Sequence, residues 1–162
     1  MNLDLKDDVT PMCLRPYPVT RVHESIFRKE IERLVKLVFS RSKNNSELGA
    51  PSFDQPKLKT NCVRFISDSR NLNRQIKRKP YSMPKIQEIL LNLEGFQYAN
   101  SLDLNMGCYR ICISKESSNL CTIILTFGKY KYKCLPKWIC NSPYIFQDKM
   151  IEMFCGIEFI KS

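Results

Sequence analysis

The stretch APSFDQPKLKTNCVRFIS, residues 50–67, contains two short runs with strand character on either side of a lysine-rich turn. The first run is APSFDQ, the second is VRFIS, and the turn between them is PKLKTN. Short runs that contain aromatic and β-branched residues, bounded by turn residues, favour paired strands. We therefore predict a β-hairpin whose turn is basic.

Before the hairpin, an extended arm is predicted to lead into a helix. Residues 1–21 contain three prolines and few periodic apolar residues, so we predict that they are extended. From about residue 23 to residue 38, apolar residues recur at helical spacing, with charged residues between them: Phe27, Ile31, Leu34, Val35 and Val38. This pattern predicts a helix with one buried face.

Two further helices are predicted behind the hairpin. After the polar run SRNLNRQIKRK, Ser82 and Pro84 favour a helix start, and Gly95 favours its end. The apolar stripe of this helix consists of Ile86, Ile89, Leu90 and Leu93. Ser142 and Pro143 favour the start of the other helix. Its apolar face consists of Phe146, Met150, Met153 and Phe154.

Strand patterns lie between and after these helices. The predicted strands are FQYANSLDL (96–104), YRICIS (109–114), LCTIILTF (120–127), YKYKCL (130–135) and a last one that begins at GIEFI (156–160). KESSN is predicted to be a polar loop, and Gly128 a hinge. Because strands and helices interleave with short returns, we predict one α+β domain with helices packed on an antiparallel sheet.

Positive charge is concentrated in one part of the chain. The formal net charge of the 162 residues is +10, and residues 57–85 hold nine basic residues against the single acid Asp68, a local excess of eight. Such a concentration favours a polyanionic partner, either nucleic acid or an anionic membrane surface. No signal peptide and no apolar run of about 18 residues is found, so we expect an intracellular protein of the cytoplasm or nucleus.

The eight cysteines do not follow a metal-binding pattern. No Cys-x-x-Cys pair occurs, and His23 is the only histidine. A structural zinc ion needs four close sulfur or nitrogen ligands. We therefore interpret the cysteines as scattered reduced thiols that act as small hydrophobic residues, and we assign His23 no role.

Six motifs in their order along the chain resemble the reverse transcriptase of gypsy-like LTR retrotransposons. They are RPYPVTRVHESIFRKEIERLVKL, GAPSF, RFISDSRNLNRQIKRKPYSMPKI, SLDLNMG, FGKYKYKCLP and NSPYIFQDKM. The resemblance implies RNA-directed DNA polymerase activity and a fingers and palm fold. It implies an arm at 1–21, fingers at about 22–82, and at about 83–162 mostly palm with a hairpin associated with the fingers.

The resemblance also implies a catalytic residue. Asp103 matches the first catalytic aspartate of the family, which binds metal together with a backbone carbonyl, here that of Leu104. The cofactor would be Mg²⁺ or Mn²⁺, because in-line attack on a nucleotide phosphate uses two divalent ions and hard cations prefer oxygen ligands. From SLDL alone, a solvated aspartate at a strand end or a helix cap is the alternative.

Further site residues follow from the same resemblance. The nucleotide-binding positions would be Lys57 or Lys59, Arg64, Cys108 and Lys137. The positions that contact the RNA or DNA template-primer would be Arg70, Asn73, Arg74, Lys77, Arg78, Lys79, Ser142, Pro143 and Gln147. Guanidinium and ammonium groups suit phosphate oxygens, although an ordinary solvated run of charge is the alternative for the basic residues.

Four features depart from the family pattern. Cys108 stands where the family has a tyrosine or phenylalanine that excludes the 2′-hydroxyl, and Trp138 stands where the family has a glycine. The turn PKLKTN lacks the usual glycine, which leaves the register of its two lysines open. The family continues into a Tyr-x-Asp-Asp motif after the position of GIEFIKS, so we expect an incomplete palm.

Two classes of function therefore remain open from the sequence. The chain is either a fragment of a reverse transcriptase polyprotein, inactive alone, or a non-catalytic nucleic-acid-binding or inert remnant of a mobile element. The expected partners are template-primer and deoxynucleoside triphosphate. We also expect self-association, because an unfinished palm sheet leaves an unpaired strand edge.

Overall fold

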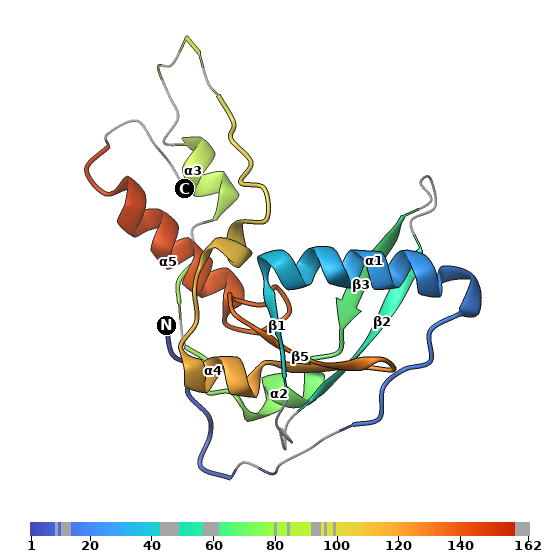
Figure 1. The fold of residues 1–162 in the computed structure, drawn as a ribbon. Coiled ribbons are helices and arrows are strands. Elements are labelled where there is room, and N and C mark those ends of the chain that lie inside the picture. The colour runs from blue at the N-terminus through green and yellow to red at the C-terminus, as the bar shows by residue number, and fades with distance from the viewer. Residues whose placement is uncertain are drawn as a thin grey trace.

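The strands of the described chain form one five-stranded sheet, and helices come before, between and after them along the sequence (Figure 1). The computed structural model describes residues 1–8, 10, 14–42, 49–56, 62–79, 81–83, 85–91, 95, 97–98 and 100–157. Within these residues the strands are β1 (Phe39–Arg41), β2 (Ala50–Pro56), β3 (Val63–Ser67), β4 (Thr122–Leu125) and β5 (Gly128–Tyr132). The helices are α1 (Arg21–Leu37), α2 (Arg70–Gln75), α3 (Ile86–Leu91), the 3₁₀ helix η1 (Gly107–Arg110), α4 (Lys115–Leu120) and α5 (Ser142–Phe154). The predicted α+β class is confirmed.

The hairpin predicted at residues 50–67 is present as β2 and β3. The two strands are antiparallel, with Asp54 opposite Phe65 and Gln55 opposite Arg64. Side chains alternate along β3, so Phe65 is buried and Arg64 is exposed. This alternation is the period of two that a half-buried strand requires.

One strand pair is parallel, which corrects the prediction of a purely antiparallel sheet. The strand order is β1-β5-β4-β2-β3, and β2 runs parallel to β4 with Ala50 opposite Ile123 and Pro51 opposite Ile124. All four residues of β4 are buried, as expected for an inner strand. The apolar pattern of a short strand identifies its buried positions but not the direction of its neighbour.

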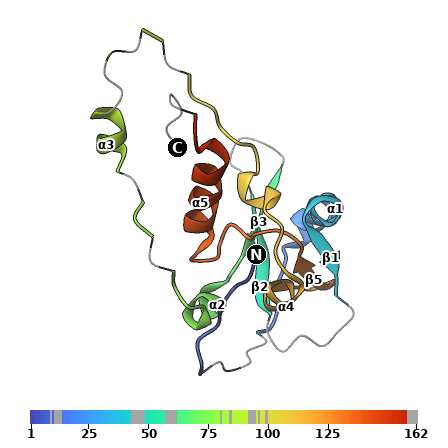
Figure 2. The ribbon, with the colours of Figure 1, turned by 90° about the vertical axis from the view of Figure 1, so that its left-hand side faces the viewer.

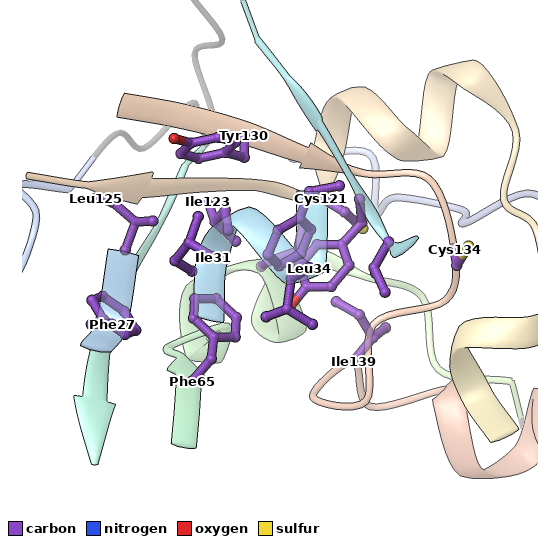
Figure 3. Packing of buried hydrophobic residues seen from close by; sticks show 14 of the residues in the cluster. Phe27, Ile31, Leu34, Phe65, Cys121, Ile123, Leu125, Tyr130, Cys134 and Ile139 are labelled. Atoms are coloured by element: carbon purple, nitrogen blue, oxygen red, sulfur yellow. The ribbon is translucent and has the colours of Figure 1, made fainter. Parts of the chain in front are cut away.

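Helix α1 supplies the predicted buried face. Its residues Phe27, Ile31 and Leu34 are buried, and the helix packs on β1, β2 and β3. Figure 3 shows these side chains against Phe65 of β3 and Leu125 of β4. Full burial of each such side chain contributes about 1.5 to 3 kcal/mol. This core holds the hairpin in place relative to the rest of the sheet.

The N-terminal arm is extended, as predicted, and it is docked on the protein. Leu5 forms an isolated antiparallel bridge with Ile76, and the amide of Lys6 donates to the carbonyl of Gln75 over 2.8 Å. Leu3 is buried, and its amide donates to Ser117 Oγ over 2.8 Å. The arm therefore connects the segment after α2 with α4.

The prediction of a strand at residues 96–104 is wrong for the described residues of that segment. Residues 97, 98 and 100–104 form no strand and run outside the sheet (Figures 1 and 2). Their alternating apolar side chains are exposed, with Tyr98 and Leu102 each at 88%. A segment with alternating apolar side chains forms a strand only where a neighbouring strand pairs with its backbone. The described residues provide no such neighbouring strand.

Two other local predictions are corrected. In the segment 109–114, Tyr109 and Arg110 end η1, and only Cys112 makes a β-bridge, to Cys134. KESSN is helical and belongs to α4, whose N-cap Ser114 accepts a hydrogen bond from the amide of Ser117. The polar run 69–79 likewise contains α2. Polar composition concealed both helices, although serine is a favoured N-cap residue.

The two remaining predicted helices are present. Helix α3 is shorter than predicted, and its described apolar side chains are not buried: Ile86 is 75% exposed and Leu91 70%. Helix α5 begins at Ser142 as predicted, and Phe146 packs against Gly107, where an added Cβ would lie 2.6 Å from the ring. Gly107 therefore lets η1 approach α5.

The end of the described chain is not a strand. Residues 156 and 157 lack strand structure, and the rest of the predicted strand GIEFI lies outside the described residues, as do Pro84 and Leu93. Across the part of the chain that the structure describes, no helix is both long enough and apolar enough to cross a membrane.

Candidate functional site

An ion pair at the start of α2 fixes the first arginine of the candidate site. Arg70 donates from Nε to Asp68 Oδ1 over 2.8 Å and from its terminal nitrogen to Asp68 Oδ2 over 2.6 Å. The hydroxyl of Tyr17 donates to the same carboxylate over 3.1 Å. These hydrogen bonds, that from Arg70 above all, lower the pKa of Asp68 to about 2. Arg70 therefore carries its charge beside a carboxylate that is ionised at neutral pH.

Two asparagine side chains join the basic residues to residues 138–141, a segment that begins at the last residue of LPKW (135–138). Asn73 donates from Nδ2 to the carbonyl of Trp138 over 2.8 Å and accepts from the amide of Cys140 over 2.9 Å. Asn141, which is 1% exposed, donates to the carbonyl of Lys77 over 2.9 Å and accepts from the amide of Lys79 over 3.3 Å. Each asparagine side chain satisfies one backbone donor and one backbone acceptor on the opposite segment. These hydrogen bonds fix the position of the two segments relative to each other.

The basic tract, defined here as Arg70, Arg74, Lys77, Arg78 and Lys79, is exposed along its length. Two aspartates of the N-terminal arm neutralise part of its charge. Lys77 Nζ lies 3.1 Å from Asp7, and Lys79 Nζ lies 3.4 Å from Asp4. Arg74 and Arg78 make no ion pair among the described residues. Exposed pairs of this kind contribute little to stability, so phosphates can replace their carboxylates at small cost.

A cleft of about 770 Å³ adjoins the tract. It is lined by aromatic and polar side chains that include Tyr17, Phe53, Arg70, Asn73 and Trp138. Trp138 is 43% exposed, so part of its indole faces the cleft and solvent. The cleft therefore combines ring surface with a guanidinium group, which are features that nucleobases and phosphates can contact.

The predicted nucleotide-binding residues are only partly brought together. Cys108, on η1, is half-buried; burial raises the pKa of its thiol, and the nearby charge of Lys137 partly opposes the shift. Lys137 Nζ lies 5.9 Å from the ring centre of Tyr109. Arg64 is exposed on β3. Lys57 and Lys59 lie outside the described residues.

Asp103 lies in the exposed segment before η1. Its carboxylate is exposed, and the carbonyl of Leu104 accepts a hydrogen bond from the amide of Gly107 over 3.2 Å. No group of three or more His, Cys, Asp or Glu side chains occurs anywhere in the described ranges. A pair of Mg²⁺ ions needs several carboxylates, so the described residues around Asp103 do not by themselves fit two metal ions.

The start of α5 is tightly anchored. Ser142 is buried, and its hydroxyl donates to the carbonyl of Pro136 over 2.5 Å. Pro143 is exposed at the first turn. The amide nitrogen of Gln147 is buried and has no hydrogen-bond partner among the described residues. Ser142 thus positions the helix, and Gln147 keeps a free donor on it.

Three residues of the site could not be recognised from the sequence. Asp68 appeared only as the one acid in a basic stretch, and neither Tyr17 nor Asn141 was singled out. Asp68 and Tyr17 meet across 51 positions of sequence, and Asn141 meets Lys77 across 64. Asn141 is the N-cap of α5, and asparagine is a favoured N-cap residue. This preference is the one local signal that could have indicated Asn141.

Replacing Asp68 with asparagine should lower the free energy of unfolding by about 1 kcal/mol at pH 7, after allowance for the exposure of Arg70. The pKa of Asp68 falls from its ordinary 3.8 to about 2 on folding. The stabilisation is therefore complete above about pH 4 and is lost as the pH falls toward 2. Urea unfolding of both proteins at pH 7 and pH 2.5 measures this difference. Equal losses at both pH values would contradict it, and Asp148→Asn, on α5, is the control.

The sequence of this chain is similar to parts of two transposon Pol polyproteins. The Pol polyprotein of the Drosophila melanogaster transposon 297 is 28% identical over 145 residues, which cover 87% of this chain and 14% of the polyprotein. That of transposon 412, also from Drosophila melanogaster, is 29% identical over 163 residues, which cover 97% of this chain and 13% of the polyprotein. The chain therefore spans about one seventh of these relatives.

The fold has close counterparts among solved structures. The foamy viral protease-reverse transcriptase in complex with an RNA/DNA hybrid matches with a TM-score of 0.82 and 23% identity, over 96% of this chain and 21% of that chain. No protein-family model matches the chain. The chain therefore has a retroviral reverse transcriptase fold and matches the reverse transcriptase region of gypsy-type transposon Pol polyproteins.

Proposed function

We propose that this chain binds the template-primer duplex of an RNA-directed DNA polymerase, through phosphate contacts of the basic tract. The observation that carries the proposal is the pair of asparagines that holds the basic tract against residues 138–141 beside the cleft. A rigid row of cations contacts a phosphate backbone without reading its sequence. The solved complex of the foamy viral enzyme with an RNA/DNA hybrid supports a duplex of this kind as the partner.

The nucleotide-binding part of the proposal rests on Cys108 and Lys137. Lys137 offers an exposed ammonium group close to Cys108, which suits a triphosphate. A divalent metal would supply charge neutralisation at the reacting phosphate, with Asp103 and the Leu104 carbonyl as ligands from this chain. Further carboxylates would have to complete that site.

A non-catalytic role in nucleic-acid binding is the second candidate. It is favoured by the indole of Trp138 in the cleft wall, where the resembling family has glycine. An indole restricts the close approach of a substrate that glycine permits. Primer extension separates the two candidates, whereas duplex binding is common to both.

Removing the carboxylates of Asp4 and Asp7 should raise the affinity for an RNA–DNA duplex by about threefold at about 50 mM salt. These groups lie 3.4 Å and 3.1 Å from Lys79 and Lys77, so they compete with phosphate for the same cations. Fluorescence anisotropy with Asp4→Asn/Asp7→Asn measures the change. Asp8→Asn, in the same arm but without an ion pair among the described residues, is the control and should change affinity less. Unchanged affinity in the double variant would contradict the competition.

The exposed apolar side chains of α3, of residues 97, 98 and 100–104, and of α5 should cause self-association at about 20–50 μM. Leu91 is 70% exposed and Met153 68%, and α3 and α5 lie on the side of the molecule opposite α1 (Figure 2). In sedimentation velocity, Leu91→Glu/Met153→Glu should shift the protein toward monomer. Val22→Glu, at a 78% exposed position on α1, should not. A wild-type protein that sediments as a stable monomer would refute this expectation.

The experiment that tests the proposed function is binding of a labelled RNA–DNA duplex as salt is varied. Phosphate contacts make affinity fall steeply with salt, whereas contact through apolar surface alone does not. Salt-independent binding, or no binding at low salt, would refute the proposal.

A further inference from the structure

Cys112 and Cys134 face each other across an isolated antiparallel bridge. Two backbone hydrogen bonds flank them: Ile113 N donates to Lys133 O over 3.2 Å, and Leu135 N donates to Ile111 O over 2.8 Å. The cysteines exchange no backbone hydrogen bond with each other, so they form the non-hydrogen-bonded type of pair, in which side chains approach most closely.

Such a pair suits a disulfide. Opposed Cα atoms in a non-hydrogen-bonded pair lie about 4.5 Å apart. Disulfides span Cα separations of about 4.4 to 6.8 Å. The two thiols are near enough to affect each other, because electrostatic interaction with Cys112 contributes, after burial, to raising the pKa of Cys134. Little backbone movement is therefore needed to join the two sulfur atoms.

The two thiols differ in accessibility. Cys112 is exposed, whereas Cys134 is 8% exposed at the end of the core opposite Phe27 and Leu125 (Figure 3). An exposed thiol meets a soluble oxidant first, and a neighbouring buried thiol can then resolve the adduct. The other buried cysteine of the described chain, Cys121, is wholly enclosed, and burial raises its pKa to about 12.

We propose that Cys112 and Cys134 form a reversible disulfide by exchange with a small disulfide such as oxidised glutathione. The Cys112 thiolate attacks one glutathione sulfur, forms a mixed disulfide and releases one glutathione thiolate. Cys134 then loses its proton to solvent, attacks Cys112 Sγ and releases the second glutathione. The protein loses two hydrogens, and one oxidised glutathione becomes two reduced molecules.

The bond would connect two segments of the candidate site. Cys112 follows η1, which carries Cys108, and Cys134 precedes LPKW, which carries Lys137 and Trp138. Cys108 and Lys137 already lie close together. A covalent link two residues behind η1 and one residue before LPKW would fix the spacing between these segments. The redox state of the pair thus sets the rigidity of this part of the site.

Tryptic peptides make the test direct. Cleavage after Arg110 and Lys115 releases ICISK (111–115), and cleavage after Lys133 and Lys137 releases CLPK (134–137), each with one cysteine. The folded chain is equilibrated with reduced and oxidised glutathione, quenched with acid, alkylated, digested and analysed by mass spectrometry. We expect an ICISK–CLPK pair whose mass is about 2 Da below the sum of the two reduced peptides.

Variants test the order of the two steps. In Cys134→Ala, Cys112 should accumulate as the glutathione adduct, whereas in the wild type this adduct should be at least about tenfold less abundant. Cys62 and Cys155, both exposed, serve as internal controls, because they should carry glutathione only. The proposal is overturned if ICISK and CLPK are never linked in the folded wild type, or if Cys112 retains glutathione to the same extent as Cys62.

Discussion

Alanine at all five positions of the basic tract should weaken binding of an RNA–DNA duplex at least about a hundredfold at about 50 mM salt. The tract supplies five of the nine basic residues between positions 57 and 85, where the local excess of positive charge is eight. Each cation that neutralises a phosphate releases a condensed counterion, and the releases add. Because the side chains are exposed, their removal should leave the fold intact, which circular dichroism would check.

A charge-matched control separates local contact from overall charge. Helix α1 carries five basic residues outside the site: Arg21, Arg28, Lys29, Arg33 and Lys36. Their replacement by alanine changes the net charge by the same amount. If the site is the basic tract, this control should weaken binding less than about tenfold. Equal losses in both variants would show that only total charge matters and that the tract is not the binding surface.

A polypeptide of these 162 residues should give no detectable primer extension on an RNA template with Mg²⁺ or Mn²⁺. The sequence contains no Tyr-x-Asp-Asp, and Asp103 alone supplies one carboxylate. Loss of metal-based charge stabilisation raises the reaction barrier by several kcal/mol. Attachment of a Tyr-Ile-Asp-Asp hairpin after Ser162 should restore weak activity at most, because Trp138 still lines the cleft.

Two substitutions in the extended polypeptide test the altered positions. Trp138→Gly should raise its activity by about tenfold or more, since glycine permits close backbone approach. Cys108→Tyr should sharpen selection of deoxyribonucleotides over ribonucleotides, because a larger side chain occupies the space of a 2′-hydroxyl. Asp103→Asn is the control and should abolish activity. Extension by the unextended chain that depends on Asp103 would refute the prediction, and full activity with Trp138 retained would show that the indole obstructs nothing.

Helices and strands whose apolar residues recur at a regular spacing could be predicted from the sequence. Helix α1 and the β2–β3 hairpin are confirmed because their buried faces follow the periods of 3.6 and 2. The segment 96–104 has the alternating apolar residues of a strand. Whether such a segment forms a strand depends on a neighbouring strand to pair with, and not on its own residues alone. Helices α2 and α4 lack an apolar stripe. Ser114 caps α4, and Asn73 ties α2 to Trp138 and Cys140, contacts that polar composition does not reveal.

The charge of the candidate site was visible in composition, but its arrangement was not. The basic tract follows from counting residues. The contacts that position it join Asn73 to Trp138 and Asn141 to Lys77, across 65 and 64 residues. Likewise the cysteines are interpreted from the sequence as scattered, whereas the β-bridge places Cys112 opposite Cys134. Pairings over such distances depend on the whole fold rather than on local pattern.

The measurement that tests the central claim most directly is the salt dependence of duplex binding. For about five neutralised phosphates, log K against log salt concentration should have a slope of about −4 to −5 for the wild type and for the α1 control. The basic-tract variant should have a slope close to zero. A wild-type slope near zero, or an unchanged slope in the basic-tract variant, would contradict the proposal that this tract holds the phosphate backbone.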